Sequence, residues 1–173
     1  MKMKPIETDR LLLRPYTLDD AQEVWEYQRD PAVTKYTNDG GVRTLSEIES
    51  ILRDVIIEGD YVKYGYGRMA VVHRESNKII GFCGLKYLPE LDQVDIGYRY
   101  ATEYWGQGLA TEAGLAVMQF GWQELQLPRI IGMALPENKA SVRVLEKLGL
   151  EFVRNDIDEG IDIVVYAADS PVS

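Results

Sequence analysis

The sequence predicts a mixed α/β domain with about seven strands, and three observations support this prediction. Segments of strand-like alternation and of helical periodicity follow one another as strand, two helices, three strands, helix, strand, helix and two strands. The chain has 173 residues, of which 46% are hydrophobic, so it is long enough to bury a sizeable core. It shows no internal repeat and no linker, and residues 1–173 are therefore expected to form a single domain.

The first strand and the first helix are predicted before residue 31. A short apolar run from Arg10 to Tyr16 is typical of a strand. Thr17 offers an N-cap with Asp20 three positions later, which imitates a capping box. Apolar residues then recur at helical spacing until Pro31, whose ring blocks the continuation of the helix.

A second helix is predicted to begin at Thr44, which forms a capping box with Glu47. Its apolar stripe consists of Leu45, Ile48, Leu52 and Val55. Gly59 is the expected end of this helix, because glycine favours the position that follows a helix.

Three strands are predicted in the middle of the chain. Arg68–His73 and Lys78–Tyr87 are rich in Val, Ile and aromatic residues and flank a turn-like Glu-Ser-Asn, so they are expected to pair antiparallel. In Gln93–Tyr100 apolar residues alternate with polar or small ones, which indicates a strand with one apolar face.

Helical periodicity returns in the last part of the chain. A helix is expected from Gly108, a strand covered on both faces over Arg129–Leu135, and a short helix over Asn138–Leu148. The closing strands are predicted at Phe152–Val153 and Ile161–Ala167.

The charge balance excludes some classes of partner. With 28 acidic and 19 basic residues the formal charge is -9, which argues against nucleic acid or an anionic membrane surface as the main partner. The single cysteine, Cys83, cannot form an internal disulfide, and the N-terminal residues lack the apolar stretch of a signal peptide. The longest apolar run is too short to span a bilayer. We therefore expect a cytoplasmic monomer or homodimer.

Two common kinds of catalytic site have little support in the composition. His73 is the only histidine, so a serine–histidine–aspartate set is not available. One histidine and one cysteine also give no basis for a metal site. His73 at the end of a strand and Cys83 within a strand are expected to be structural.

The segment Tyr104–Thr111 joins a predicted strand to a predicted helix and contains two glycines. Glycines let the backbone approach a ligand, and the first turn of a helix offers unpaired N–H groups, so this turn can hold a phosphate. It is not a Walker A loop, because no Gly-Lys-Ser/Thr follows. It departs from a dinucleotide fingerprint, since Thr111 takes the third glycine position and no acidic residue stands near Arg129. An ordinary strand-to-helix connection also fits the turn alone.

Three stretches of sequence give this turn its context. They are I-G-Y-R-Y followed by Y-W-G-Q-G-L-A-T-E-A, the opening E-T-D-R-L-L-L-R-P, and the later P-E-N-K-A-S-V-R-V-L-E-K-L-G-L-E-F-V. In this order they resemble the GNAT acetyltransferases over almost the whole chain, in particular the branch that includes ribosomal-protein N-terminal acetyltransferases. The resemblance implies a mostly antiparallel twisted sheet that splays at a cofactor slot, with helices on both faces. It also implies transfer of an acetyl group from acetyl-CoA to a primary amine. A protein or peptide N-terminus is the favoured acceptor, and a polyamine or other small amine is the alternative.

The resemblance further implies which residues contact coenzyme A. The family loop has the form [QR]-x-x-G-x-[GA] and binds the pyrophosphate through backbone N–H groups. Gly108 and Ala110 match its last two fixed positions, whereas Trp105 stands where Gln or Arg is usual. This departure should alter contacts at the edge of the loop more than binding itself. The implied cofactor-binding residues are Ile96, Gly97, Tyr98, Arg99, Tyr100, Trp105, Gly106, Gln107, Gly108, Leu109, Ala110, Thr111, Asn138 and Ser141.

Asn138 and Ser141 can be explained simply as an N-cap and a polar residue of the first helical turn. In the family the matching Asn contacts the cofactor and the Ser lies near its sulfur. Ser141 is therefore the candidate acid for the leaving thiolate. A thiol with a pKa of about 8.5 leaves readily, so the help from an acid should be modest. The basic residues Lys139, Arg143 and Lys147 could hold the 3′-phosphate or form a solvated helix face.

The general base has two candidates, Asp95 and Glu137. Asp95 could instead pair with Arg99 on the same strand face. An α-amine with a pKa of about 7.8 is partly neutral at neutral pH and could react through a distant base and a water molecule. A lysine side chain, with a pKa of about 10.4, would need a dedicated base.

The acceptor pocket is the part on which the sequence says least. Its candidate residues lie in the first two helices and nearby loops, and they are Tyr27, Tyr36, Tyr61, Tyr64 and Tyr66. These residues could line a pocket or simply pack, and the acidic chain would favour a cationic acceptor. Two other functions stay open: a non-catalytic acyl-CoA-binding module and a dinucleotide-binding oxidoreductase domain.

Overall fold

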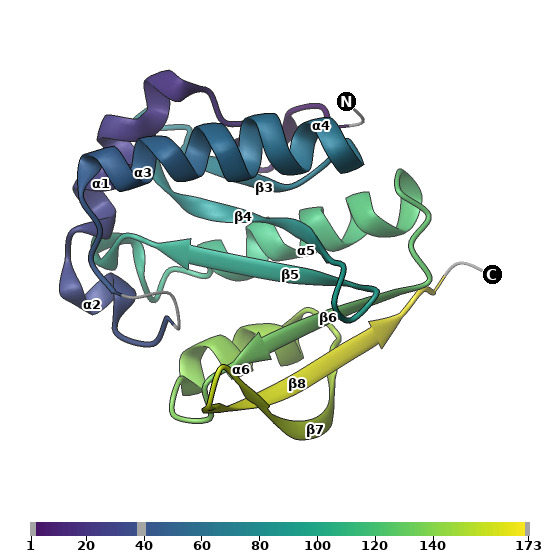
Figure 1. Cartoon of the computed structure of the whole chain (residues 1–173). Coiled ribbons are helices and arrows are strands. Elements are labelled where there is room, and N and C mark those ends of the chain that lie inside the picture. The colour runs from purple at the N-terminus through teal and green to yellow at the C-terminus, as the bar shows by residue number, and fades with distance from the viewer. Residues whose placement is uncertain (1–2, 38–40, 172–173) are drawn as a thin grey trace.

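The computed structural model of the chain describes residues 3–37 and 41–171. Within these residues a single twisted sheet crosses the molecule (Figure 1). Its eight strands are β1 (Ile6–Glu7), β2 (Leu11–Arg14), β3 (Arg68–His73), β4 (Lys78–Leu88), β5 (Gln93–Tyr100), β6 (Arg129–Ala134), β7 (Glu151–Asp158) and β8 (Ile161–Asp169). They lie in the order β1-β2-β3-β4-β5-β6-β8-β7, and every neighbouring pair is antiparallel except β5 and β6.

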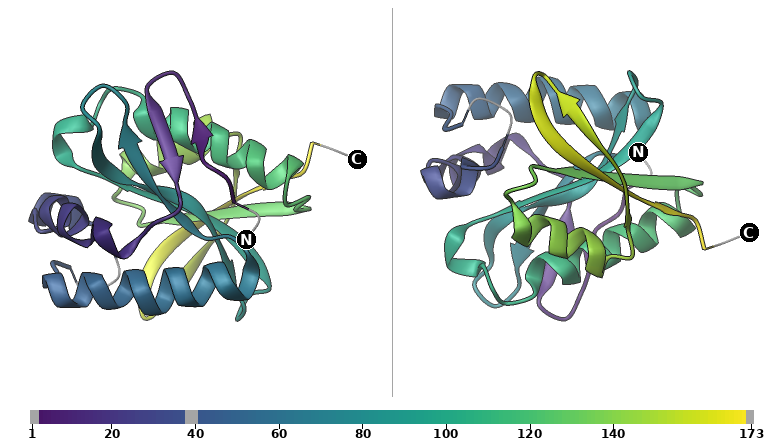
Figure 2. Two further views of the ribbon diagram at one scale, coloured as in Figure 1. Left: turned by 90° about the horizontal axis from the view of Figure 1, so that it is seen from above. Right: turned by 90° about the horizontal axis from the view of Figure 1, so that it is seen from below.

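Helices cover both faces of this sheet. They are η1 (Leu18–Asp20), α1 (Ala21–Gln28), α2 (Pro31–Thr34), α3 (Leu45–Ser50), η2 (Ile51–Asp60), α4 (Tyr61–Tyr64), η3 (Thr102–Tyr104), α5 (Leu109–Gln123) and α6 (Lys139–Lys147). The continuous helix formed by α3, η2 and α4 lies with α1 on one face, and α5 lies with α6 on the other (Figure 2). The predicted mixed α/β fold with helices on both faces is confirmed.

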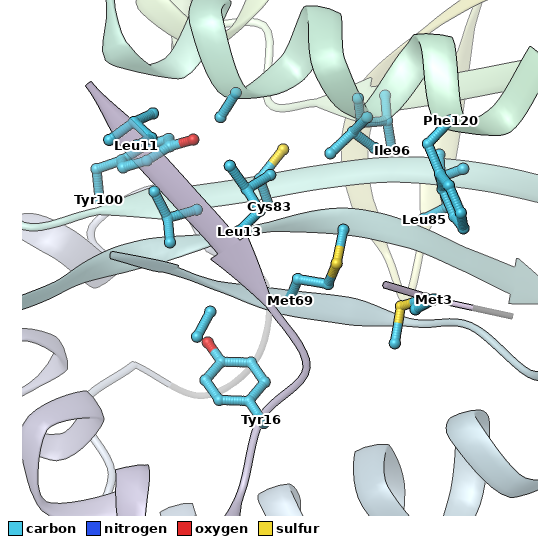
Figure 3. Packing of buried hydrophobic residues seen from close by; sticks show 14 of the residues in the cluster. Met3, Leu11, Leu13, Tyr16, Met69, Cys83, Leu85, Ile96, Tyr100 and Phe120 are labelled. Atoms are coloured by element: carbon cyan, nitrogen blue, oxygen red, sulfur yellow. The ribbon is translucent and has the colours of Figure 1, made fainter. Parts of the chain in front are cut away.

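The hydrophobic core lies on both sides of the central strands. Leu85 of β4, Ile96 of β5 and Phe120 of α5 meet beneath α5 (Figure 3). Because side chains alternate along a strand, Asp95 and Gly97 of β5 face the opposite way, toward α1 and η2. This alternation divides β5 between a core face and a polar face.

Several elements have the bounds that the sequence predicts, and the capping residue and the proline act as expected. Gln93–Tyr100 and Arg68–His73 are strands over the whole of those ranges. The Thr44 hydroxyl accepts a hydrogen bond from the Glu47 N–H at 3.2 Å and caps α3. Pro31 does not continue α1, and it begins the short helix α2 instead.

The second helix does not end at Gly59, so that prediction is wrong. The helix passes through the π-helical segment η2 and ends after Tyr64, where Gly65 has a φ of 81°. The wider π turn brings the Asp54 carbonyl oxygen against residue 59, and a Cβ there would lie 2.7 Å from it. Gly59 is therefore an interior residue of the wide turn. Two further differences are the extra strand β1 and the greater length of β7.

Candidate active site

The sheet opens into a fork between β5 and β6. These two parallel strands share a single register pair, Asp95 with Ile131. Beyond it, β5 stays paired with β4 on one edge as far as Tyr100, which lies opposite Gly81. The other edge of residues 96–100 has no strand partner among the described residues. The predicted splay therefore exists, and it exposes the backbone N–H and C=O groups of this stretch to a ligand.

The loop that follows β5 is exposed and has an unusual backbone. Gly106 and Gly108 have φ angles of 74° and 77°, which favour glycine. No atom lies within 4 Å of the position that a Cβ of Gly106 would take. The loop therefore presents open backbone to solvent, as a phosphate cradle requires.

Helix α5 begins directly after this loop. The Glu112 N–H donates to the Gly108 carbonyl oxygen at 3.0 Å, which is the first backbone bond of the helix. The N–H groups of Leu109, Ala110 and Thr111 precede it and have no capping side chain. They lie at the positive end of a 15-residue helix dipole, an arrangement that suits an anion.

An ionic brace that the sequence reasoning missed holds this loop. Arg10 donates from Nη1 to the Gln107 carbonyl oxygen at 2.8 Å and from Nε to Glu112 Oε1 at 2.8 Å. The Thr8 hydroxyl and the Arg10 N–H both donate to Glu112 Oε2. The only sequence signal was the motif E-T-D-R, because the two halves of the brace stand about a hundred residues apart.

Trp105, the irregular residue of the loop, contacts the end of β5. Its indole Nε1 donates to the Tyr100 carbonyl oxygen at 2.8 Å, while the side chain stays half-exposed. The indole therefore ties the loop to the strand before it.

Ser141 lies across the fork from β5, in the first turn of α6. The Asn138 Oδ1 accepts from the Ser141 N–H at 3.2 Å, so Asn138 is the N-cap that the sequence allowed. Tyr98 of β5 donates its hydroxyl to the Ser141 carbonyl oxygen at 2.8 Å, and its oxygen lies 3.1 Å from Ser141 Oγ. Since the only phenolic hydrogen is used on the carbonyl, the Ser141 hydroxyl donates to Tyr98. Burial raises the pKa of Tyr98 well above its ordinary value, although the Ser141 contact opposes this rise.

Asp95 lies at the base of the fork on the polar face of β5. Its carboxylate oxygen Oδ2 is 3.7 Å from Arg68 Nη2. Burial raises the pKa of Asp95 to about 6, while the charges of Arg68 and Lys86 oppose the rise. The alternative that Asp95 pairs with Arg99 is wrong: Asp95 faces Arg68, and Arg99 donates to Gln28 of α1 at 3.0 Å.

The other candidate residues are spread more widely. Glu137 and the basic residues Lys139, Arg143 and Lys147 are exposed around α6. Tyr61 is buried, donates to the Arg68 carbonyl oxygen and accepts from the Tyr16 N–H. Tyr61 is one of the five tyrosines considered for the pocket, and its hydroxyl links α4 to the sheet through these two hydrogen bonds.

No helix in residues 3–37 and 41–171 is both long and apolar enough to cross a bilayer. Over the same residues no three His, Cys, Asp or Glu side chains gather in an arrangement that would hold a metal ion.

Comparisons with known proteins agree with this geometry. The sequence profile of the acetyltransferase (GNAT) domain matches residues 10–151. An uncharacterized N-acetyltransferase of Bacillus licheniformis, p20, is 31% identical over 153 residues, which cover 86% of this chain and 83% of p20. The crystal structure of a GNAT-family acetyltransferase from Bacillus anthracis superposes with a TM-score of 0.80 at 29% identity, over 96% of this chain and 98% of the other. RimL, a ribosomal L7/L12 α-N-protein acetyltransferase in complex with coenzyme A, has the same fold, with a TM-score of 0.81 at 17% identity over 98% and 100%.

Proposed function

The chain belongs to the GNAT acetyltransferase family, and from this premise we propose that it acetylates the α-amine of a protein or peptide with acetyl-CoA as donor. Acetyl-CoA-dependent N-acetylation is the activity of the family, and the choice of acceptor is the part proposed. The observation that carries the proposal is the fork between β5 and β6, which opens beside a loop and a helix end suited to phosphate. We also infer that the whole chain acts as one domain, in the cytoplasm.

The described residues fit coenzyme A at this fork. The N–H groups of Gly108, Leu109, Ala110 and Thr111 would hold the pyrophosphate, since they have no other acceptor in the described structure. The open edge of residues 96–100 would bind the pantetheine arm as a further strand would. Asn138 and Ser141 form the opposite wall of the fork, across from Tyr98.

Acetyl-CoA supplies the acetyl group as a thioester, whose C–S bond breaks as the amine nitrogen forms the new C–N bond. The amine loses one proton in this reaction and the thiolate gains one. Ser141 is the proposed proton donor to the sulfur, and Asp95 is the proposed acceptor of the amine proton, directly or through water. Glu137 is the weaker base candidate because it is exposed to solvent.

The pKa of the acceptor favours an α-amine. With a pKa of about 7.8, such an amine needs little help to lose its proton, and a base with a pKa near 6 provides that help at neutral pH. The likeness to RimL, which acetylates a ribosomal protein's α-amine, agrees with this choice. A polyamine or another small amine is the alternative acceptor.

A thiol-release screen tests this function. Purified chain and acetyl-CoA would be incubated with peptides that have free N-termini, with polyamines, with aminoglycosides and with amino acids. Faster thiol release with peptides than with the other amines supports the proposal. Faster release with a small amine than with peptides would identify a small amine as the acceptor. Tight acetyl-CoA binding without release on any amine would indicate a binding module. Thermal stabilisation by a nicotinamide dinucleotide but not by coenzyme A would indicate an oxidoreductase domain.

A further inference from the structure

The side chain of Arg68 crosses the polar face of the sheet from β3 to β5. Arg68 lies opposite Gly84 of β4, where a Cβ would lie 2.7 Å from the Arg68 Cα, so glycine lets the two backbones approach closely. The Arg68 guanidinium reaches Gly97 of β5, the cross-strand partner of Gly84. A Cβ at Gly97 would overlap Nη2 and lie 2.5 Å from Cζ and 2.9 Å from Nη1. Gly97 therefore leaves room for a guanidinium that lies against β5.

One part of this guanidinium is anchored and another is open. Nη1 donates to the Gly84 carbonyl oxygen at 2.6 Å and to the Asp95 carbonyl oxygen at 3.1 Å. Nη2 lies 3.7 Å from Asp95 Oδ2, beyond hydrogen-bond distance. Apart from this ion pair with Asp95, no acceptor in the described structure binds Nε or Nη2, and the side chain remains 17% exposed. Nε and Nη2 form the edge through which arginine binds a carboxylate with two parallel hydrogen bonds.

The position of the guanidinium relates it to the reaction. Gly97 lies two residues beyond Asp95, the last residue of β5 that pairs with β6. The open guanidinium edge therefore lies at the start of the fork, close to the place where an amine would meet the thioester. Beside it the Asp95 carboxylate presents the opposite charge. A cation and an anion this close together match a molecule that carries a carboxylate and an ammonium a few bonds apart.

We propose that Arg68 binds a carboxylate of the acceptor through Nε and Nη2, and thereby selects amines that carry a carboxylate close to the reacting nitrogen. This rests on the proposed function, because it assumes that the amine reacts at the fork. Arg99 adds a second positive charge on the same face: its guanidinium carbon lies 5.5 Å from the centre of the Phe82 ring, and that of Arg68 lies 6.0 Å from it. Two guanidinium groups therefore lie on this face beside the Asp95 carboxylate, although the chain as a whole is acidic.

Two kinds of acceptor offer this chemistry. In a free amino acid the α-carboxylate and the amine are attached to the same carbon, and a peptide that begins with Asp or Glu has a side-chain carboxylate near its α-amine. The experiment compares each with a partner that lacks this carboxylate: alanine with alaninamide, and an amidated peptide beginning with Asp with the same peptide beginning with Asn.

The rate of thiol release would give kcat/KM for each acceptor with the unchanged chain, with Arg68→Gln and with Arg154→Gln. The third protein is a matched control, because Arg154 is exposed on β7. We expect the unchanged chain and the control to prefer the carboxylate acceptor about tenfold to a hundredfold, since a hydrogen-bonded charge pair contributes this much. Arg68→Gln should remove the preference, so that kcat/KM for the charged acceptor falls about tenfold to a hundredfold more than kcat/KM for the uncharged one. Loss of the Arg68 charge beside Asp95 alters both rates alike and cancels in their ratio.

Each outcome has a distinct meaning. A preference confined to the free amino acid identifies the α-carboxylate, and one confined to the peptide identifies the side chain. Equal loss for charged and uncharged acceptors in Arg68→Gln would show a purely structural role and overturn the inference. Absence of any preference in the unchanged chain would overturn it as well, while the proposed function would stand. If none of the tested amines causes thiol release, the proposed function itself is wrong.

A second variant covers the case in which Arg68→Gln does not fold, as judged by circular dichroism and coenzyme A binding. Arg68→Lys keeps the charge and loses the two-pronged edge. It should reduce the carboxylate preference by about tenfold. An undiminished preference in this variant would contradict binding through Nε and Nη2.

Discussion

Arg10 and Glu112 join the two ends of the donor site: Arg10 Nε lies 2.8 Å from Glu112 Oε1, and the same guanidinium donates to the Gln107 carbonyl oxygen. Burial pulls the pKa of Glu112 upward, but hydrogen bonds from Thr8 and Arg10 outweigh this and hold it below its ordinary value. The carboxylate is therefore charged at neutral pH and keeps Arg10 against the loop.

Arg10→Ala should weaken coenzyme A binding, because the loop loses the hydrogen bond that fixes Gln107. We expect the dissociation constant, measured by calorimetry, to rise about three- to tenfold. Arg53→Ala is the matched control, since Arg53 is an exposed arginine paired with its neighbour Asp54 on the far helix. Equal affinities in the Arg10 and Arg53 variants would exclude a role for the brace.

Gly106→Ala tests the backbone of the loop. Gly106 and Gly160 both have positive φ, 74° and 80°, and neither has an atom within 4 Å of a Cβ. Alanine at either position should therefore cost a similar 1–2 kcal/mol, roughly, of unfolding free energy. Only Gly106→Ala should weaken coenzyme A binding, because Gly160 lies in the turn between β7 and β8. Urea denaturation and calorimetry separate the two effects, and identical binding by both variants would count against the loop as the phosphate site.

Ser141→Ala and Tyr98→Phe test the contact across the fork. At saturating acetyl-CoA, Ser141→Ala should lower kcat about tenfold without abolishing it, because a thiolate leaves readily even unprotonated. Tyr98→Phe removes the partner that accepts the Ser141 hydrogen bond, and should lower kcat by a smaller factor. Wild-type kcat in Ser141→Ala would remove the residue from the mechanism.

Asp95→Asn tests the base through its pH profile. With its pKa near 6, Asp95 takes up the amine proton only above that pH, so kcat/KM should rise with pH through about 6. Asp95→Asn should lose this limb and about ten- to a hundredfold in rate at pH 7, while the later rise from the amine's own ionisation remains. An unchanged profile would leave Glu137 or water as the base.

The same carboxyl affects stability with a defined sign. Its pKa is raised in the folded chain from 3.8 to about 6, so the folded state binds more protons between these values. The contribution of Asp95 to the unfolding free energy is full below about pH 4 and is lost as the pH rises through 6. The free energy of unfolding, measured by denaturation at pH 4 and pH 8, should fall with rising pH more in the unchanged chain than in Asp95→Asn.

Local patterns predicted most of the fold. Gln93–Tyr100 alternates strictly, and Thr44 has a side chain that caps its own helix, so neither depends on distant residues. The prediction that the second helix ends at Gly59 was wrong because the sequence does not distinguish a glycine at the end of an α-helix from one inside a π-helix. The width of the turn becomes visible only through the Asp54 carbonyl five residues before.

The residues proposed to bind coenzyme A could be predicted from neighbouring sequence positions, whereas Arg68, which is proposed to bind the acceptor, could not. The loop glycines and the start of α5 are adjacent in sequence, and the family resemblance assigned them together. Arg68 reaches its place through a cross-strand pair of glycines, Gly84 and Gly97, on two other strands. No spacing along the chain encodes such a meeting, so the sequence offered only Arg99, on the same strand face, as a possible partner of Asp95.

The π-helical segment η2 sets the rotation of α4, the helical turn that follows it. Tyr61 follows η2 directly and joins the Tyr16 N–H to the Arg68 carbonyl oxygen. Deleting one residue from η2 would turn the following helix by about 100° and move this hydroxyl away from both strands. Tyr61 thus couples the rotation of this helix to the first residue of β3. If Arg68 binds the acceptor as we propose, an insertion or deletion in η2 should change acceptor preference without touching the fork.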